Sequence, residues 1–75
     1  MIRFALPVGA TVKLDVFDIQ GRRLRTLQDG ALPAGYDAVE WDGRDGAGIR
    51  VPPGTYFYRL TAGSFRAERK MTIVK

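Results

Sequence analysis

Short runs of alternating apolar and polar residues, separated by glycine and proline, constrain this chain more than any other feature. Nine glycines and four prolines are distributed through its 75 residues. The clearest run between them is 11–18, which places Val12, Leu14 and Val16 on one face and Lys13, Asp15 and Phe17 on a face expected to be mostly wet. Alternation with a period of two is typical of a strand with one buried face, and helical periodicity is almost absent. The sequence therefore predicts an all-β chain.

The turn signals divide the sequence into expected strands and loops. The expected strands are 2–6, 11–18, 23–28, 36–41, 55–62 and 65–74, with at most a short edge strand around Ile49 and Val51. The glycine- and proline-rich segments 29–35 and 42–54 are expected to be loops. About six or seven short strands in this pattern favour a small Ig-like or fibronectin-like antiparallel β-sandwich. The aromatic residues expected to anchor its core are Phe4, Trp41, Tyr56, Tyr58 and Phe65.

The residue types that are missing narrow the chemistry. The chain has no cysteine and no histidine, which excludes disulfides, the usual zinc sites, and nucleophiles activated by histidine. Ser64 falls in a predicted turn with no base beside it. We therefore expect no enzyme activity and no cofactor.

The charge and apolar patterns argue against a nucleic-acid partner and against a membrane span. Twelve lysines and arginines and eight acids give a formal net charge of +4, but the cations are spread along the whole chain. Nucleic-acid modules usually gather their cations on one face, so no nucleic-acid partner is expected. No apolar run approaches the ~18 residues of a membrane span. The isolated domain is expected to be a monomer.

Two features allow both a structural and a functional interpretation. Asp42 and Asp45, three residues apart in a glycine-rich loop, could bind calcium, but the sequence favours carboxylates that accept hydrogen bonds from backbone amides of successive turns. Phe57 lies on the opposite face from Tyr56 and Tyr58. It could contact a partner or a sugar, although burial is the favoured interpretation.

Several runs, taken in order, carry a family resemblance. They are V-K-L-D-V-F-D-I-Q-G-R, A-G-Y-D-A-V-E-W-D-G-R-D-G-A-G, P-P-G-T-Y-F-Y-R-L and R-K-M-T-I-V-K. The most specific pieces are V-x-D-x-x-G, W-D-G and G-x-Y, which supply Val16, Asp18, Gly21, Trp41, Asp42, Gly43, Gly54 and Tyr56. The chain resembles the Ig-like domain shared by the C-terminal sorting domains of type IX (Por) secretion substrates and by the flagellar hook-capping protein (FlgD).

The resemblance implies roles for these motifs in the fold. Asp18 and Gly21 would set a turn between core strands, Trp41 would cap the core, and Asp42 and Gly43 would begin the following loop. The G-x-Y motif resembles the tyrosine corner of immunoglobulin sandwiches, in which a tyrosine hydroxyl bonds to upstream backbone.

The resemblance also implies a function. Sorting domains are recognised by an outer-membrane translocon, and the matching residues here are Gly54, Tyr56, Arg69, Lys70 and Lys75. Residues 1–75 would then be a single non-catalytic domain from the C-terminus of a larger exported protein. That protein would pass through the periplasm to the surface or exterior of a Gram-negative-type bacterium, and the domain's partner would be the translocon or surface-anchoring machinery. One alternative is a structural assembly module like the hook cap, with other subunits of an extracellular assembly as partners. Another is a carbohydrate-binding accessory domain that uses Phe57.

Overall fold

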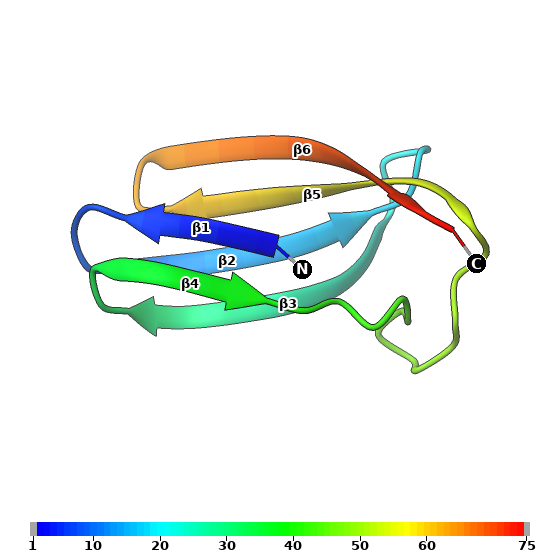
Figure 1. The fold of residues 1–75 in the computed structure, drawn as a ribbon, viewed down its shortest axis with the longest axis horizontal. Coiled ribbons are helices and arrows are strands. Elements are labelled where there is room, and N and C mark those ends of the chain that lie inside the picture. The colour runs from blue at the N-terminus through cyan, green and yellow to red at the C-terminus, as the bar shows by residue number, and fades with distance from the viewer. Residues whose placement is uncertain (1, 75) are drawn as a thin grey trace.

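The computed structural model describes residues 2–74, and these form six strands and no helix. The strands are β1 (Ile2–Leu6), β2 (Ala10–Phe17), β3 (Arg23–Leu32), β4 (Gly35–Val39), β5 (Gly54–Ala62) and β6 (Phe65–Ile73). All pairings are antiparallel. One sheet has the order β3-β2-β5-β6, and the smaller sheet pairs β1 with β4 and packs across it (Figure 1). The predicted all-β sandwich is confirmed.

The core between the sheets is aliphatic. Val12, Leu14 and Val16 of the central strand β2 have no exposed surface, as their alternation predicts. Leu14 lies opposite Leu60 of β5 in the ladder, so both side chains point to the same face. The buried cluster consists of Ile2, Leu6, Val12, Leu14, Leu60 and Ala62.

The aromatic residues contribute less to the core than the sequence predicts. Tyr56 is buried, whereas Phe4, Tyr58 and Trp41 are only half-buried. The prediction for Phe65 is wrong, because its side chain is 58% exposed. Phe65 begins β6, which lies at the edge of the large sheet, where two strands facing four leave part of the inner face uncovered.

The prediction of a loop over residues 29–35 is also wrong. β3 continues to Leu32 because β2 supplies ladder partners as far as the pair Ala10 and Leu32, so that tertiary pairing overrides the turn preference of the glycine within it. Only Pro33 and Ala34 connect β3 to β4. β4 ends at Val39, which leaves Trp41 outside the strands.

Candidate functional site

Two of the sequence motifs, far apart along the chain, meet at one end of the sandwich. Trp41 packs edge-on against Tyr56, with ring centroids 5.5 Å apart and an interplanar angle of 70°. The Trp41 Nε1–H donates to the carbonyl of Arg44 at 2.9 Å, and the Tyr56 hydroxyl donates to the carbonyl of Pro52. The second contact is the predicted tyrosine corner, and it is confirmed. The segment 40–53, here called the Trp41 loop, is thus fastened to the start of β5.

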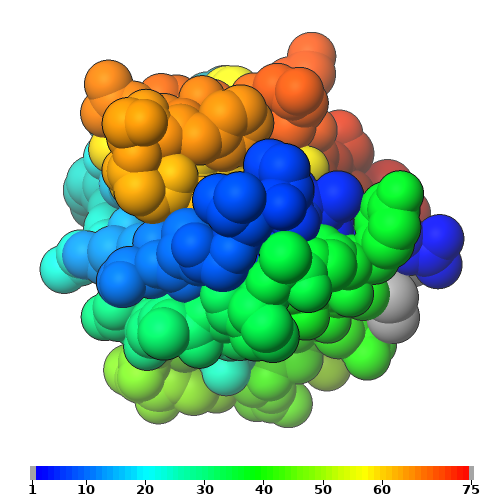
Figure 2. Space-filling model, turned by 90° about the vertical axis from the view of Figure 1, so that its left-hand side faces the viewer, coloured from blue at the N-terminus to red at the C-terminus, as the bar shows by residue number. Residues whose placement is uncertain are grey.

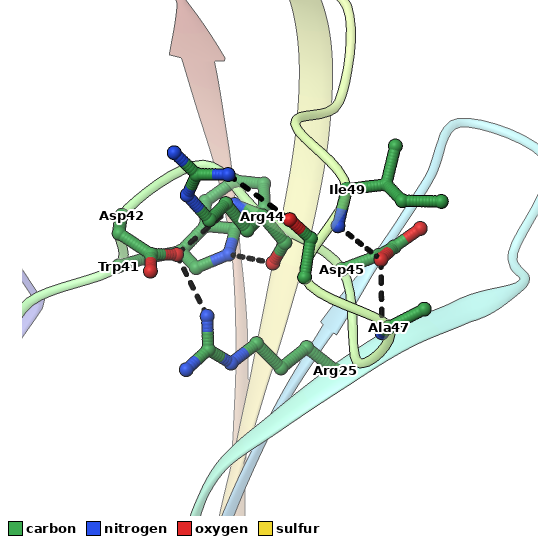
Figure 3. Close-up of polar contacts among 8 residues, drawn as sticks. Arg25, Trp41, Asp42, Arg44, Asp45, Ala47 and Ile49 are labelled. Carbon is green, nitrogen blue, oxygen red and sulfur yellow. Dashed lines mark hydrogen bonds and ion pairs between the residues drawn. The ribbon is translucent and has the colours of Figure 1, made fainter.

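Asp42 fastens the same loop to β3. Its Oδ1 accepts from the backbone N–H of Arg44 at 3.0 Å and from the guanidinium of Arg25 at 2.7 Å (Figure 3). Arg25 lies in β3, so this ion pair joins two segments that the sequence analysis does not connect. No pattern in the sequence points to this pairing.

Asp45 organises the tip of the loop in a similar way. Its Oδ1 accepts from the backbone N–H groups of Ala47 at 2.9 Å and Ile49 at 3.0 Å (Figure 3). The predicted carboxylate-to-amide bonds of Asp42 and Asp45 are therefore confirmed. Among residues 2–74, no group of three or more acidic side chains is arranged to hold a metal ion.

Backbone contacts complete the anchoring of the Trp41 loop. The Gly46 N–H donates to the carbonyl of Leu24 at 2.8 Å, and a Cβ atom built on Gly46 would lie 3.4 Å from that same oxygen. The Val51 N–H donates to the carbonyl of Gly43 at 2.8 Å, and Val51 itself is buried. The long irregular segment is therefore held by its own polar groups together with Leu24 and Arg25 of β3.

The V-x-D-x-x-G motif forms the turn between β2 and β3, as predicted. Asp18 Oδ1 accepts from the backbone N–H groups of Gln20 and Arg22, each at 2.9 Å, and Oδ2 accepts from the Arg22 side chain at 2.8 Å. Gly21 has a φ of 84°, in the left-handed region that glycine tolerates. These hydrogen bonds, led by the Arg22 backbone N–H, stabilise the carboxylate and lower the pKa of Asp18 below its ordinary value of 3.8.

Among the described residues, those matched to translocon recognition lie on the neighbouring strands β5 and β6 but do not share one exposed face. Gly54 and Tyr56 lie at the start of β5, and the Tyr56 side chain is buried with its hydroxyl engaged. Arg69 and Lys70 are exposed neighbours on β6, so their side chains point to opposite faces of the sheet. Lys75 lies outside the described residues.

Phe57 is not buried as favoured in the sequence analysis. It is half-buried on the outer face of the large sheet, where it lies opposite Phe17 of β2 in the ladder. The Arg59 guanidinium lies 4.9 Å from the centre of the Phe17 ring. Neither sheet supplies a second layer over this face among the described residues, and the β2–β3 turn with Ile19 borders the hollow beside Phe57.

Asp15 departs from the expected wet face of β2. Only 8% of the residue is exposed. Its Oδ1 accepts from the Thr26 hydroxyl at 2.6 Å, and its Oδ2 lies 4.0 Å from the Lys13 ammonium. A shift in register between Leu14 and Asp15 places Thr26 opposite Asp15, and alternation alone could not predict this shift.

Comparison with known proteins identifies the family. The family model described as the FlgD Ig-like domain matches residues 2–65. The chain belongs to this family. The predicted resemblance to the Ig-like domain of the flagellar hook-capping protein is thus confirmed.

Curated and solved relatives agree with the family assignment. The basal-body rod modification proteins FlgD of Salmonella typhimurium and Salmonella typhi are each 40% identical over 53 residues, which is 71% of this chain and 23% of theirs. A crystal structure of FlgD from P. aeruginosa superposes with a TM-score of 0.73 at 28% identity and covers 93% of this chain and 55% of that one. This FlgD Ig-like domain therefore spans less than a quarter of the curated relatives it matches.

The family is a structural, non-catalytic one. None of the described residues belongs to a helix long and apolar enough to cross a membrane.

Proposed function

We propose that this FlgD Ig-like domain is a structural assembly module of the bacterial cell envelope, which acts as one unit of a longer protein in a flagellar or related extracellular structure. The family match over residues 2–65 carries the proposal. The printed name of the Salmonella relatives, basal-body rod modification protein, supports a role in assembly rather than in catalysis. The partners would be rod, hook or equivalent subunits.

The geometry of the polar residues supports this proposal. Asp18, Asp42 and Asp45 all accept hydrogen bonds from backbone amides in turns. Their carboxylates therefore stabilise the fold and are not free to bind a substrate. A domain whose turns are held in this way presents constant surfaces to neighbouring subunits, as an assembly module requires.

A pull-down with the longer parent protein tests the proposal. The intact parent and a version lacking the Ig-like domain would be incubated with purified rod and hook subunits from the same bacterium, and retained subunits would be quantified. We expect the version without the domain to retain fewer rod or hook subunits than the intact parent. Equal retention by both proteins would contradict the proposal.

The exposed cations of β6 support sorting as a second candidate. Arg69 and Lys70 are both solvent-exposed and correspond to the basic end that the sorting resemblance highlights. A periplasmic reporter fused to residues 1–75 should then reach the surface of a host competent for type IX secretion, and a fusion carrying Arg69→Ala and Lys70→Ala should not. Retention of the unmodified fusion in the periplasm would reject sorting.

A further inference from the structure

The two sheets of the sandwich have unequal widths, and this leaves one strand edge open. β1 pairs with β4 from Ile2 opposite Val39 to Leu6 opposite Gly35. The other edge of β1 has no partner strand within residues 2–74. Alternate residues of an antiparallel strand direct their N–H and C=O groups to each side, so part of the β1 backbone presents unpaired donors and acceptors at this edge.

The inward face of β6 lies beside that open edge. In the ladder, Met71 is opposite the buried Tyr56 and Ala67 is opposite the buried Leu60, so Met71 and Ala67 point toward the interior of the sandwich. The full inward face of β6 consists of Phe65, Ala67, Arg69, Met71 and Ile73. Four of these five residues are apolar, yet none of the five is buried.

A hollow lies at each end of the space between β1 and this face. One, with a volume of about 580 Å³, is lined by the end of β1, the β1–β2 connection and the β5–β6 turn, and Leu6 and Phe65 both contribute to it. The other, about 270 Å³, lies at the opposite end and is lined in part by Ile2 and Met71. Figure 2 looks onto the end of the sandwich where the blue β1–β2 connection lies beside the orange β5–β6 turn. We call the space between the free edge of β1 and the inward face of β6 the β1–β6 groove.

We propose that the β1–β6 groove binds an extended segment of a partner chain, which adds to β1 as a third strand of the small sheet. Strand addition would satisfy the free backbone groups of β1. Alternate apolar side chains of the segment would pack onto Phe65, Ala67, Met71 and Ile73 of β6. This inference goes beyond the assembly function, since it rests on the geometry of β1 and β6 alone.

Arg69 specifies the charge of the segment. It is the single charged residue on the inward face of β6, and it forms no ion pair with any residue in the described range 2–74. Its side chain donates only to the Glu68 carbonyl, at 2.9 Å. The segment therefore carries an acidic residue at an inward position near its middle.

The same charge argument disfavours a second copy of this chain as the occupant. β1 has the sequence I-R-F-A-L, whose one charged residue is Arg3. Two β1 strands paired edge to edge would provide no acid for Arg69, because β1 contains no acidic residue. An acidic and apolar segment of a different protein fits the groove better.

Synthetic peptides test this proposal. A nine-residue peptide, Val-Thr-Val-Thr-Glu-Thr-Val-Thr-Val with blocked ends, directs its valines and glutamate to one face. Its matched control exchanges the glutamate with the threonine before it, which keeps the composition and turns the acid outward. Titrated into isotope-labelled domain, the first peptide should shift the amide resonances of β1 and β6 and slow hydrogen exchange at the open edge of β1. The control should bind more weakly.

Arg69→Glu provides the second arm, because Arg69 is exposed and its replacement should leave the fold intact. We expect this substitution to weaken binding of the glutamate peptide about three- to tenfold and to favour a peptide with lysine at the same position. Methylating the peptide nitrogens that face β1 should abolish binding, whereas methylating the alternate set should not.

Three results would overturn the proposal. The first is no binding at peptide concentrations up to about 1 mM. The second is a set of shifts confined to the outer face around Phe17 and Phe57. The third is concentration-dependent dimerisation through β1 without peptide, which would make a second copy the occupant. None of these results would affect the pull-down with the longer parent protein, so the two proposals fail separately.

Discussion

At the scale of single residues, the Tyr56 hydroxyl joins the start of β5 to the Trp41 loop. Tyr56→Phe removes one hydrogen bond to the Pro52 carbonyl and leaves the ring against Trp41. We expect the free energy of unfolding to fall by about 0.5–1.5 kcal/mol, because a part-buried hydrogen bond is lost. Urea unfolding at neutral pH measures this change. Tyr36→Phe is the matched control, since Tyr36 is 92% exposed, and equal stability of the two variants would contradict the tyrosine corner.

Asp18 gives the fold a dependence on pH. Its pKa is lowered in the folded state by the Arg22 backbone N–H and then by the Arg22 guanidinium. The ionised carboxylate therefore stabilises the fold above the ordinary pKa of 3.8, and this stabilisation is lost as the pH falls through the lowered folded-state pKa. Asp18→Asn should be less stable than the parent at about pH 7, with a smaller difference at about pH 2.5. Urea titrations at both values measure it, and a difference that does not change with pH would refute this role.

At the scale of elements, the central strand β2 determines stability more than the aromatic motifs do. Leu14 has no exposed surface, so Leu14→Ala should lower the free energy of unfolding by about 3–4 kcal/mol. Trp41 is half-buried and lies outside the strands. Trp41→Ala should therefore cost less, about 1–3 kcal/mol, through loss of the Tyr56 contact and the bond to Arg44. Thermal melts of the two variants measure which substitution destabilises the domain more. A larger loss for Trp41→Ala would mean that the contacts around Trp41 and Tyr56 form the main core.

The elements also show what alternation can and cannot predict. Alternation identified the buried face of β2, because a period of two reports directly which side chains leave water. It failed for Asp15 and for the residues near Gly30, since both depend on which neighbour pairs with β2 and in what register. The structure of the Trp41 loop could be predicted only in part. Its Asp and Gly residues predict local turns, but the ion pair from Arg25 to Asp42 depends on the tertiary arrangement.

At the scale of the whole molecule, both sheets share one buried cluster, to which Ile2 and Leu6 of the small sheet and Leu14 and Leu60 of the large sheet belong. The sheets should therefore unfold in a single transition. Trp41 is the single tryptophan, so its fluorescence reports on the Trp41 loop, while far-ultraviolet circular dichroism reports on all strands. We expect the two urea curves to coincide. Separate midpoints would show that the Trp41 loop opens independently.

The pairing of β1 with β4 has a consequence for how the chain reaches this fold. β5 and β6 are joined by Gly63 and Ser64 alone, so their hairpin closes a very short loop. β1 pairs instead with β4, which follows both β2 and β3 along the chain. Closing a longer loop costs more entropy before any contact compensates for it. Although β1 comes first among the strands of this domain, we expect it to be among the last to be placed, so that the hydrophobic side chains of Ile2 and Leu6 stay exposed to water until late in folding.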